Sequence, residues 1–435
     1  MSMLDERLEL ALSPRRAGPA LAAALGLAPD RPPRIVDAKC DSDHGCTVVY
    51  QLGDRLVVAT SDDTAAPALD GAGWVEALGL RARVFPDDPA LPALPAVLDP
   101  ERLAGLLVRT LDGGVRVLRC RATPMRYRPG RRCTLRIDAW LRAPGGPAER
   151  RTWFGKVYHD AEKAAAVWRG MELVAAAEPV RAGRLRVAGA AAFLPEVPMI
   201  LQDPVAGVRL DGLIGPLGGP STRPAPRAAP GVRTAASALA ALHGARLDLG
   251  GERPATRELH KLARRAAAGV SVLDPDLGDR VQAVAAGLAA EADRLPRVVA
   301  PGHGDCKPAQ FLVGRGPAAL LDFDHCGMAD PAADVGSFTA SLRQLAIRRA
   351  AHSRRPAAAP DSRATWLAAL AAAFVDEYER CGGAGPELRR RVLWFERLAL
   401  LRKALRAFAR SPSSPLAPAL AEAAARPPGS EEVGW

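Results

Sequence analysis

Lysine and aromatic residues are both scarce in this chain, although the chain is strongly basic. Only six lysines contribute to its 59 Lys and Arg residues, and the formal net charge is +11. Aromatic residues make up 5% of the sequence, which is little for a surface that stacks nucleic-acid bases. The arginines are spread through Ala-, Pro- and Gly-rich sequence and are not gathered into one stripe. The composition therefore argues against nucleic acid as a partner, and it makes each lysine conspicuous.

Long apolar runs and an export signal are also missing. The sequence contains no stretch of eighteen or more strongly apolar residues, which argues against a membrane span. Its beginning, MSMLDERLELAL, has acidic residues before a short apolar run and no basic region, unlike a signal peptide. We therefore expect a cytoplasmic protein without a membrane partner.

The cysteines do not suggest a disulfide framework. Their number is odd, and without an export signal they are expected to be reduced thiols; they are Cys40, Cys46, Cys120, Cys133, Cys306, Cys326 and Cys381. Cys40, His44 and Cys46 are close enough in sequence to suggest a metal site. No second pair follows at the spacing of zinc ligands, which favours ordinary loop or strand residues there.

The N-terminal quarter of the chain reads as a separate small unit. Thr47–Tyr50 and Arg55–Thr60 are apolar, β-branched runs around Gly53–Asp54, a pattern typical of a hairpin. The proline-rich segment 85–100 is predicted to be a connector with little regular structure. We place an accessory or cap region at residues 1–95.

The rest of the chain changes from strands to helices. Segments 115–122, 133–143 and 151–159 predict three strands, a helix follows at about 160–177, and segment 191–203 predicts two short strands. From 231 onward the pattern is mostly helical, and near the C-terminus one apolar face is formed by Trp394, Leu398, Leu401, Leu405 and Phe408. This organisation suggests an N-lobe at 96–203, a helical C-lobe at 204–425 and a disordered tail at 426–435.

Two acidic loops near residue 310 carry the candidate chemistry. HGDCKPAQ (303–310) and DFD (322–324) are joined by two short apolar runs around a Gly-rich turn, and a tight hairpin there brings the two loops together. Phosphoryl transfer needs a carboxylate that accepts the hydroxyl proton, and oxygen ligands for the Mg²⁺ that bridges the phosphates. Asp305, Gln310 and Asp322 can supply these functions.

These two loops resemble the aminoglycoside phosphotransferase family, which is related to the protein kinases. HGDCKPAQF is similar to that family's H-G-D-x-x-x-x-N loop, and LLDFDHCGMADPAAD is similar to its I-D-F and D-P-x-x-D segments. The resemblance implies an α+β, protein-kinase-like fold with a small β-rich N-lobe and a large helical C-lobe. It also implies ATP or GTP as phosphate donor, Mg²⁺, and a small-molecule hydroxyl acceptor.

The resemblance assigns roles to residues of these loops. Asp305 would be the catalytic base, Gln310 and Asp322 would be metal ligands, and Asp324 would lie near a second metal. The resemblance further makes His303 a structural residue of the loop and Asp334 a buried brace that hydrogen-bonds it.

A kinase-like fold also needs a strand lysine paired with a helix glutamate to hold the nucleotide phosphates. Lys156 lies in the third predicted strand, and Glu172 lies in the following helix, with Glu162 as the alternative partner. Segment 127–133, including Arg131, would cover the phosphates. Gln202 and Asp203 would form the hinge that contacts the nucleobase of ATP or GTP. A Walker A motif is excluded, because arginine stands at 150 and valine at 157, where glycine and Ser or Thr are required.

Two departures from the family pattern leave alternatives open. Gln310 replaces the usual asparagine, which keeps the amide oxygen but moves it one methylene outward. Lys307 follows the proposed base as in serine/threonine protein kinases, where it can neutralise charge on the moving phosphoryl group. A protein kinase is disfavoured, because the interval from Asp322 to Asp334 is too short for a peptide-docking activation segment. A small-molecule kinase is therefore predicted, with an inactive, nucleotide-binding pseudokinase as the alternative.

The acceptor is not evident from the sequence. Arginines of the C-terminal helix disfavour a polycationic acceptor such as an aminoglycoside if they face the site; they are Arg389, Arg390, Arg391, Arg397 and Arg402.

Overall fold

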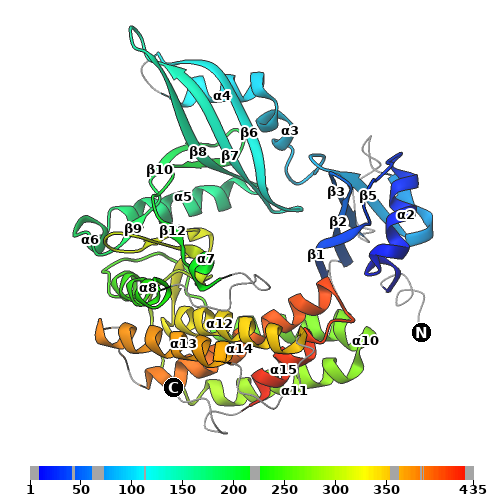
Figure 1. The fold of residues 1–435 in the computed structure, drawn as a ribbon, viewed down its shortest axis with the longest axis vertical. Coiled ribbons are helices and arrows are strands. Elements are labelled where there is room, and N and C mark those ends of the chain that lie inside the picture. Colours follow the sequence, from blue (N-terminus) through cyan, green and yellow to red (C-terminus); the bar gives the residue numbers. More distant parts are fainter. Residues whose placement is uncertain are drawn as a thin grey trace.

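The computed structural model describes residues 9–41, 45–60, 73–111, 114–215, 226–352, 362–382, 385 and 387–426. The described residues form an N-terminal sheet, a second sheet and a large helical part, as Figure 1 shows. The α+β fold class predicted from the sequence is confirmed. His44, the segment 216–225 and the predicted tail beyond Arg426 lie outside the described residues.

The N-terminal part is an antiparallel sheet covered by helix α2 (Pro14–Ala24). Its strands are β1 (Arg34–Asp41), β2 (Gly45–Leu52), β3 (Arg55–Thr60), β4 (Gly73–Val75) and β5 (Leu80–Val84), in the order β1-β2-β3-β5-β4, with a 3₁₀ turn η1 (Glu76–Leu78). The predicted hairpin is confirmed: Leu52 pairs with Arg55, and Gly53 has a φ of 57° that favours glycine. The expectation of reduced thiols is wrong at Cys46, which is disulfide-bonded and therefore is not a metal ligand.

The connector between the two sheets is more regular than predicted. It contains helix α3 (Leu94–Leu98) and leads into α4 (Pro100–Thr110), whose N-terminus is capped by the Asp99 side chain. Leu94 and Val97 are buried against the second sheet, which explains why this proline-rich stretch becomes ordered. The buried Asp88 accepts hydrogen bonds from Tyr127 Oη and Gly130 N, both at 2.8 Å. The connector therefore holds the turn between the first two strands of the second sheet.

The second sheet is antiparallel and has the order β10-β11-β8-β7-β6. Its strands are β6 (Arg116–Arg128), β7 (Arg132–Arg142), β8 (Ala148–Tyr158), β10 (Ala190–Leu194) and β11 (Met199–Gln202), which confirms the predicted strands. In β7, buried Leu135, Ile137 and Ala139 alternate with more exposed residues, as expected when one face of a sheet packs on helices. Helix α5 (Ala161–Ala175) follows β8 and is capped by the Asp160 carboxylate.

The helical part contains the loops around residues 303 and 322. Its helices are α6 (Glu178–Arg181), α7 (Leu210–Ile214), α8 (Ala228–His243), α9 (Ala255–Arg265), the π-helical turn η2 (Ala266–Val270), α10 (Ser271–Leu273), α11 (Pro275–Ala292), α12 (Ala332–His352), α13 (Ser362–Arg380), α14 (Leu388–Arg410) and α15 (Leu416–Ala425). Its short strands and 3₁₀ turns are β9 (Arg186–Val187), β12 (Val208–Arg209), β13 (Ala300–Gly302), η3 (Pro308–Gln310), β14 (Phe311–Val313), β15 (Ala319–Leu320), η4 (Phe323–His325) and β16 (Gly327–Ala329). The apolar face predicted for the C-terminal helix is buried on α14.

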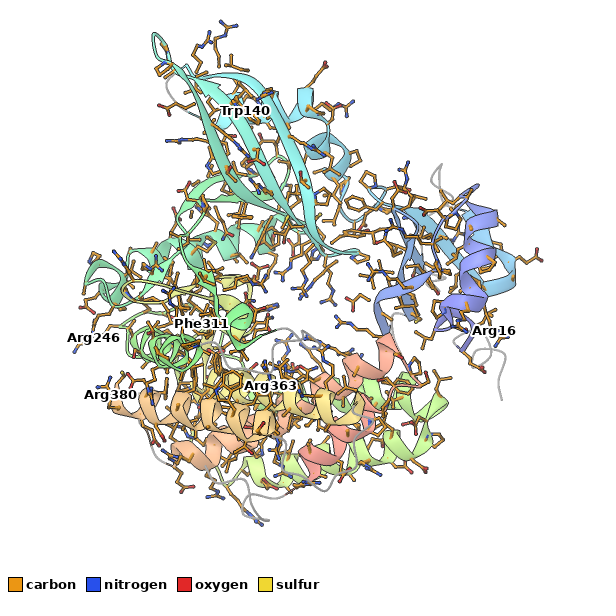
Figure 2. The ribbon with its side chains drawn as sticks, in the orientation of Figure 1. Arg16, Trp140, Arg246, Phe311, Arg363 and Arg380 are labelled. Atoms are coloured by element: carbon orange, nitrogen blue, oxygen red, sulfur yellow. The ribbon has the colours of Figure 1, made fainter. Side chains whose placement is uncertain are left out.

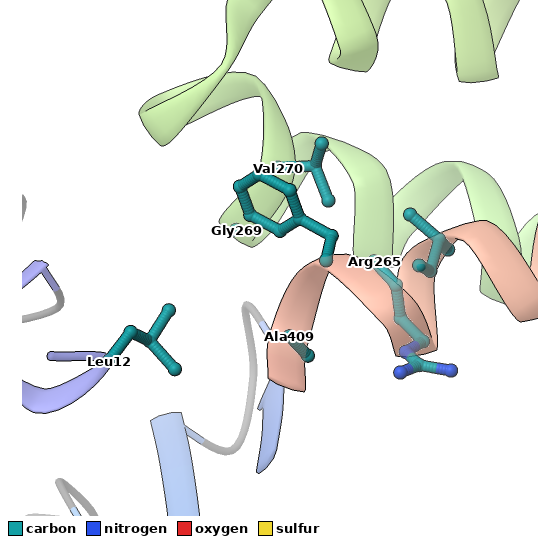
Figure 3. Close-up of a pocket in the computed structure, with 7 residues that line it drawn as sticks. Leu12, Arg265, Gly269, Val270 and Ala409 are labelled. Carbon is teal, nitrogen blue, oxygen red and sulfur yellow. The ribbon is translucent and has the colours of Figure 1, made fainter. Parts of the chain in front are cut away.

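The N-terminal part contacts the C-terminal end of α14, where the orange-red helix rises toward β1 in Figure 1. Ala409 belongs to the apolar core of the N-terminal sheet, and Arg410 lies 3.6 Å from the Asp37 carboxylate. Leu12, Val270 and Ala409 line a cavity of about 20 Å³ at this junction (Figure 3). No helix among the described residues is long and apolar enough to span a membrane.

Candidate active site

The backbone of the loop that begins at His303 is held by the buried carboxylate of Asp334. Asp334, in the first turn of α12, accepts hydrogen bonds from the backbone N–H groups of His303 (2.6 Å) and Gly304 (2.8 Å). Gly304 has a φ of 79°, and a Cβ atom there would lie 2.0 Å from the His325 carbonyl oxygen. Only glycine fits this position, which explains the middle residue of the H-G-D sequence.

Two histidines complete this support. The fully buried His303 lies 2.8 Å from the Leu321 carbonyl oxygen through Nε2, so that it connects the two acidic loops. His243, at the end of α8, lies 3.2 Å from Asp334 Oδ2 and 2.7 Å from the Tyr378 hydroxyl. His243 therefore hydrogen-bonds the carboxylate that holds the loop, a role that the sequence did not assign to it.

Asp305 projects from this loop beside two polar partners. The Lys307 ammonium contacts Asp305 Oδ2, and Gln310 Nε2 lies 3.5 Å from the same oxygen. Burial alone raises the pKa of Asp305, but the charge and hydrogen bond of Lys307 lower it to about 2. Asp305 is therefore an ionised carboxylate that can accept a hydrogen bond.

The β14–β15 hairpin places the second acidic loop next to the first. Leu321 N donates to the Gln310 carbonyl oxygen at 2.9 Å, and Gln310 Nε2 donates to Asp322 Oδ2 at 3.1 Å. Asp322 has left-handed backbone angles (φ 69°, ψ 63°), which are uncommon for a residue other than glycine. Such conformations are retained where the surrounding structure requires a side chain at that point.

Lys156 joins the second sheet to this loop. Its Nζ lies 2.7 Å from both Asp322 Oδ1 and Asp324 Oδ1, and its side chain is 8% exposed. Burial lowers the pKa of Lys156, and the carboxylate of Asp322 opposes that shift. Burial raises the pKa of Asp322, but the positive charges of Lys156 and Arg132 outweigh it and hold the pKa well below its usual range.

Arg132 belongs to the segment 127–133 that was expected to cover the phosphates, although the sequence singled out Arg131. It is buried at the start of β7, and its guanidinium contacts Asp324 and lies 3.6 Å from Asp322 Oδ1. The predicted nucleotide residue Arg131 is exposed instead. The reason is that Arg131 lies in the turn between β6 and β7, whereas Arg132 is the first residue of β7 and pairs with Tyr158 of β8. The position of Arg132 directly before the strand predicted at 133–143 is the signal that could have selected it.

The surroundings of Asp324 differ from those expected of a metal ligand. Asp324 is 3% exposed and is enclosed by Lys156, Arg132 and the Tyr158 hydroxyl, which donates to it at 3.0 Å. Its carboxylate therefore positions cations. Within the described part of the chain, His, Cys, Asp and Glu side chains do not cluster in threes as they would around a metal. Asp322 and the amide of Gln310 are hard ligands and fit Mg²⁺, which takes one or two protein ligands together with phosphate oxygens and water.

The predicted ion pair between Lys156 and Glu172 is wrong. Glu172 is exposed on α5, and so is Glu162, whereas Lys156 is paired with the two aspartates. The buried face of α5 is entirely apolar; it comprises Ala164, Val167, Gly170, Met171 and Val174. A spacing in sequence does not specify which face of the helix a glutamate occupies, and here that face points to solvent.

The predicted hinge residues lie at the end of β11. Gln202 is buried and its amide donates to the Met171 sulfur at 3.0 Å, while Asp203 is exposed and its backbone N–H donates to the Gly189 carbonyl at 3.0 Å. The Gln202 side chain therefore packs against α5.

One family model and several solved structures are similar to this chain. A sequence model described as the phosphotransferase enzyme family matches residues 147–381. No curated protein matches the chain. Among solved structures, the macrolide 2'-phosphotransferase MphH of Brachybacterium faecium is 19% identical with a TM-score of 0.44, over 77% of this chain and 99% of that one.

Two further solved structures are similar at the same level. A putative fructosamine-3-kinase of Thermobifida fusca is 17% identical with a TM-score of 0.46, over 75% of this chain and 99% of that one. A glucosamine kinase is 17% identical with a TM-score of 0.42, over 95% of this chain and 97% of that one.

The matched segment contains the strand lysine, both acidic loops and Asp334, and it spans just over half of the chain. The protein therefore belongs to the phosphotransferase enzyme family, and it is an enzyme that transfers a phosphoryl group to a hydroxyl of a small molecule.

Proposed function

We propose that the protein transfers the γ-phosphoryl group of ATP or GTP to a hydroxyl of a small metabolite, sugar or antibiotic, with Asp305 as the base. The observation that carries this proposal is a continuous series of contacts from Asp305 through Gln310 and Asp322 to Lys156. A proton acceptor, two oxygen ligands and a phosphate-binding cation are thereby held in one connected group, as phosphoryl transfer requires.

The charge of each site residue determines its proposed role. Lys156 and Arg132 bind the phosphates of the nucleotide, since both are buried cations near the ends of the inner strands β8 and β7 of the second sheet. Asp322 and the Gln310 amide would hold Mg²⁺, which supplies charge neutralisation of the phosphate oxygens when bound. Asp305 orients the acceptor hydroxyl and takes its proton. The Lys307 ammonium contacts the Asp305 carboxylate, and it can move to the phosphoryl group as negative charge develops on the phosphoryl oxygens.

Replacement of Asp305 tests this assignment. Asp305→Ala should lower kcat by about 10²–10⁴-fold, the usual contribution of a positioned general base. Nucleotide binding should change little, because Lys156 and Arg132 are untouched. The measurement is acceptor-dependent ADP release together with MgATP binding by calorimetry. An Asp305→Ala protein that turns over its acceptor at the wild-type rate would show that the base lies elsewhere.

A catalytically weak phosphotransferase that mainly binds nucleotide is the second candidate, and one observation favours it. Lys156 pairs with Asp322 and Asp324 and not with a helix glutamate, which is an arrangement that can be retained for nucleotide binding. Mg²⁺-dependent nucleotide binding with only slow transfer and slow ATP hydrolysis would support this alternative.

A further inference from the structure

A group of cations on α14 lies near Asp305. Arg402 and Arg406 are four residues apart and Lys403 precedes Arg406 by three, so that the three side chains leave adjacent turns of the helix. The strongest electrostatic neighbours of Lys403 are Arg402, Arg406, Lys307 and Asp305. The neighbours of Arg406 include Arg402 and Asp305 as well. The last turns of α14 thus bring positive charge to the carboxylate that is the proposed base.

Lys403 and Arg406 lack the carboxylate partners that the preceding arginines of α14 have. Earlier arginines of α14 are paired: Arg389 with Asp376 and Glu379, Arg391 with Asp330, and Arg397 with Glu291. In contrast, the Lys403 ammonium donates to the neutral groups Ser341 Oγ and Gln344 Oε1 of α12, both at 3.1 Å. Arg402 lies 3.6 Å from Glu258, and Arg406 has no ion pair with any residue that the structure describes. Positive charge is therefore compensated along most of α14 but not beside Asp305.

The second sheet adds more positive charge from the other side. Arg126 is an exposed side chain of β6, and its electrostatic neighbours are Arg128, Arg132, Asp322 and Asp305. Arg128 is also among the neighbours of Arg406. Within the described ranges, Arg126 and Arg128 form no ion pair. In Figure 2, nitrogen-tipped side chains gather where the ends of β6 and β7 face the C-terminal helices and the N-terminal sheet.

Such a group is costly without an anion. Lys403 and Arg402 are half-buried and Arg406 is exposed at the surface. Loss of hydration and the charges of Arg402 and Arg406 lower the pKa of Lys403 to about 7. Like charges held together repel, and a ligand of opposite charge relieves that repulsion.

The nucleotide lysine and the α14 cations have different acidic neighbours. Those of Lys156 include Asp322, whereas Lys403 and Arg406 both have Asp305, and Lys403 also has Lys307. Arg128 is common to Lys156 and Arg406. Lys403 and Arg406 are therefore associated with the residue that would touch the acceptor.

We propose that the acceptor carries a carboxylate or phosphate group besides its reactive hydroxyl, and that Arg402, Lys403 and Arg406 bind this anionic group. This inference rests on the function proposed above. In the transfer step the acceptor O–H gives its proton to Asp305, a bond forms between that oxygen and the γ-phosphorus, and the bond to the β-phosphate oxygen breaks. The nucleoside diphosphate leaves with that electron pair. Polycationic acceptors such as aminoglycosides are excluded by the same charges.

A panel of matched acceptors tests the charge preference. Sugars and polyols are supplied as neutral, amino, carboxylate and phosphate forms, for example glucose, glucosamine, glucuronate and glucose 6-phosphate, and ADP release is measured with MgATP. We expect turnover among the carboxylate or phosphate forms only. Comparing the turnover of these two forms shows which anionic group the protein prefers. Turnover of neutral or amino forms in preference to anionic ones would overturn the inference while leaving the proposed function intact. Absence of nucleotide binding would instead contradict the proposed function.

Variants connect the preference to α14. Arg406→Gln and Lys403→Gln should each raise KM for the anionic acceptor by about ten- to a hundredfold, the usual loss for a hydrogen bond to a charged group. KM for ATP should stay within about twofold of the wild type, which also shows that the variants are folded. Arg390→Gln is the matched control, because Arg390 lies on the same helix but forms an exposed ion pair with Glu387. An unchanged acceptor KM in both test variants would overturn the assignment.

A binding measurement keeps the inference testable without turnover. Malonate is titrated into the protein saturated with MgADP, so that the nucleotide phosphates already occupy their site. Wild type and Arg390→Gln should bind malonate, and Arg406→Gln and Lys403→Gln should bind it at least about tenfold more weakly. Equal binding by all four proteins, or none by the wild type, would contradict the proposed anion site.

Discussion

Removing the Lys156 ammonium tests how the buried charges of the site are balanced. Lys156→Met leaves Asp322 and Asp324, which are 16% and 3% exposed, with Arg132 as their remaining cation. Lys156 makes two charged hydrogen bonds of 2.7 Å, and each such bond contributes about 1.5–3 kcal/mol. Breaking a buried pair on one side costs about 3–5 kcal/mol because a carboxylate is left without its partner. We therefore expect Lys156→Met to lose about 3–5 kcal/mol of unfolding free energy.

A second substitution distinguishes charge imbalance from lost packing. In Lys156→Met/Asp324→Asn, one acid and one cation remain, so the double variant should recover at least half of the loss. Both proteins should fail to bind MgATP. Lys163→Met, a lysine of the next helix, serves as control and should behave like the wild type.

Urea unfolding followed by tryptophan fluorescence measures these effects. A loss of 3–5 kcal/mol should lower the midpoint of the transition that reports on the site by roughly 1 M. The reasoning is refuted if Lys156→Met unfolds within about 1 kcal/mol of the wild type. It is also refuted if the double variant is no more stable than the single one.

Two further results are expected. Glu172→Gln should leave kcat and KM for ATP within about twofold of the wild type in the ADP-release assay, because Glu172 is exposed and does not pair with Lys156; a hundredfold loss of activity would show that the two residues meet during turnover. The unfolding free energy should rise between about pH 7 and pH 10 because of Lys403. The pKa of Lys403 is lowered to about 7 in the folded protein, so over this pH range the unfolded chain holds a proton that the folded chain has lost. The groups that face it are Arg402, Arg406, Lys307 and Asp305, with Ser341 and Gln344 on α12. Lys403→Met should remove up to about 4 kcal/mol of this dependence, measured as the difference between urea midpoints at the two ends of that range; an identical dependence in both proteins would show that other groups cause it.

The sequence predicted the elements of the fold whose signals are local. Alternating apolar residues marked β6 to β8, and the two acidic loops were located because their residue types, spacing and flanking apolar runs all agree. The hairpin that joins Gln310 to Asp322 follows from the same short-range pattern.

Features that depend on facing direction or on distant partners were not predicted. Glu172 has suitable chemistry but lies on the solvent-facing side of α5, and Arg131 lies in the turn before β7; composition and spacing alone determine neither placement. His243 is about ninety residues from Asp334 in sequence, so only the tertiary structure shows their contact. Of the α14 cations, Arg402 was named from the sequence, whereas Lys403 and Arg406 were missed because other arginines of the helix drew attention; of these, Arg389, Arg390, Arg391 and Arg397 form ion pairs.

The contact between the N-terminal sheet and α14 has a practical consequence for shortened forms of the protein. Ala409 is counted in the core of the N-terminal sheet, whereas Phe408 and Leu405, within the same turn, belong to the core of the helical part. Removing residues 1–84, and with them the N-terminal sheet, would leave the final turn of α14 uncovered and expose apolar side chains to water. A protein shortened in this way should aggregate more readily, so the 435-residue chain is the appropriate unit for expression and crystallisation.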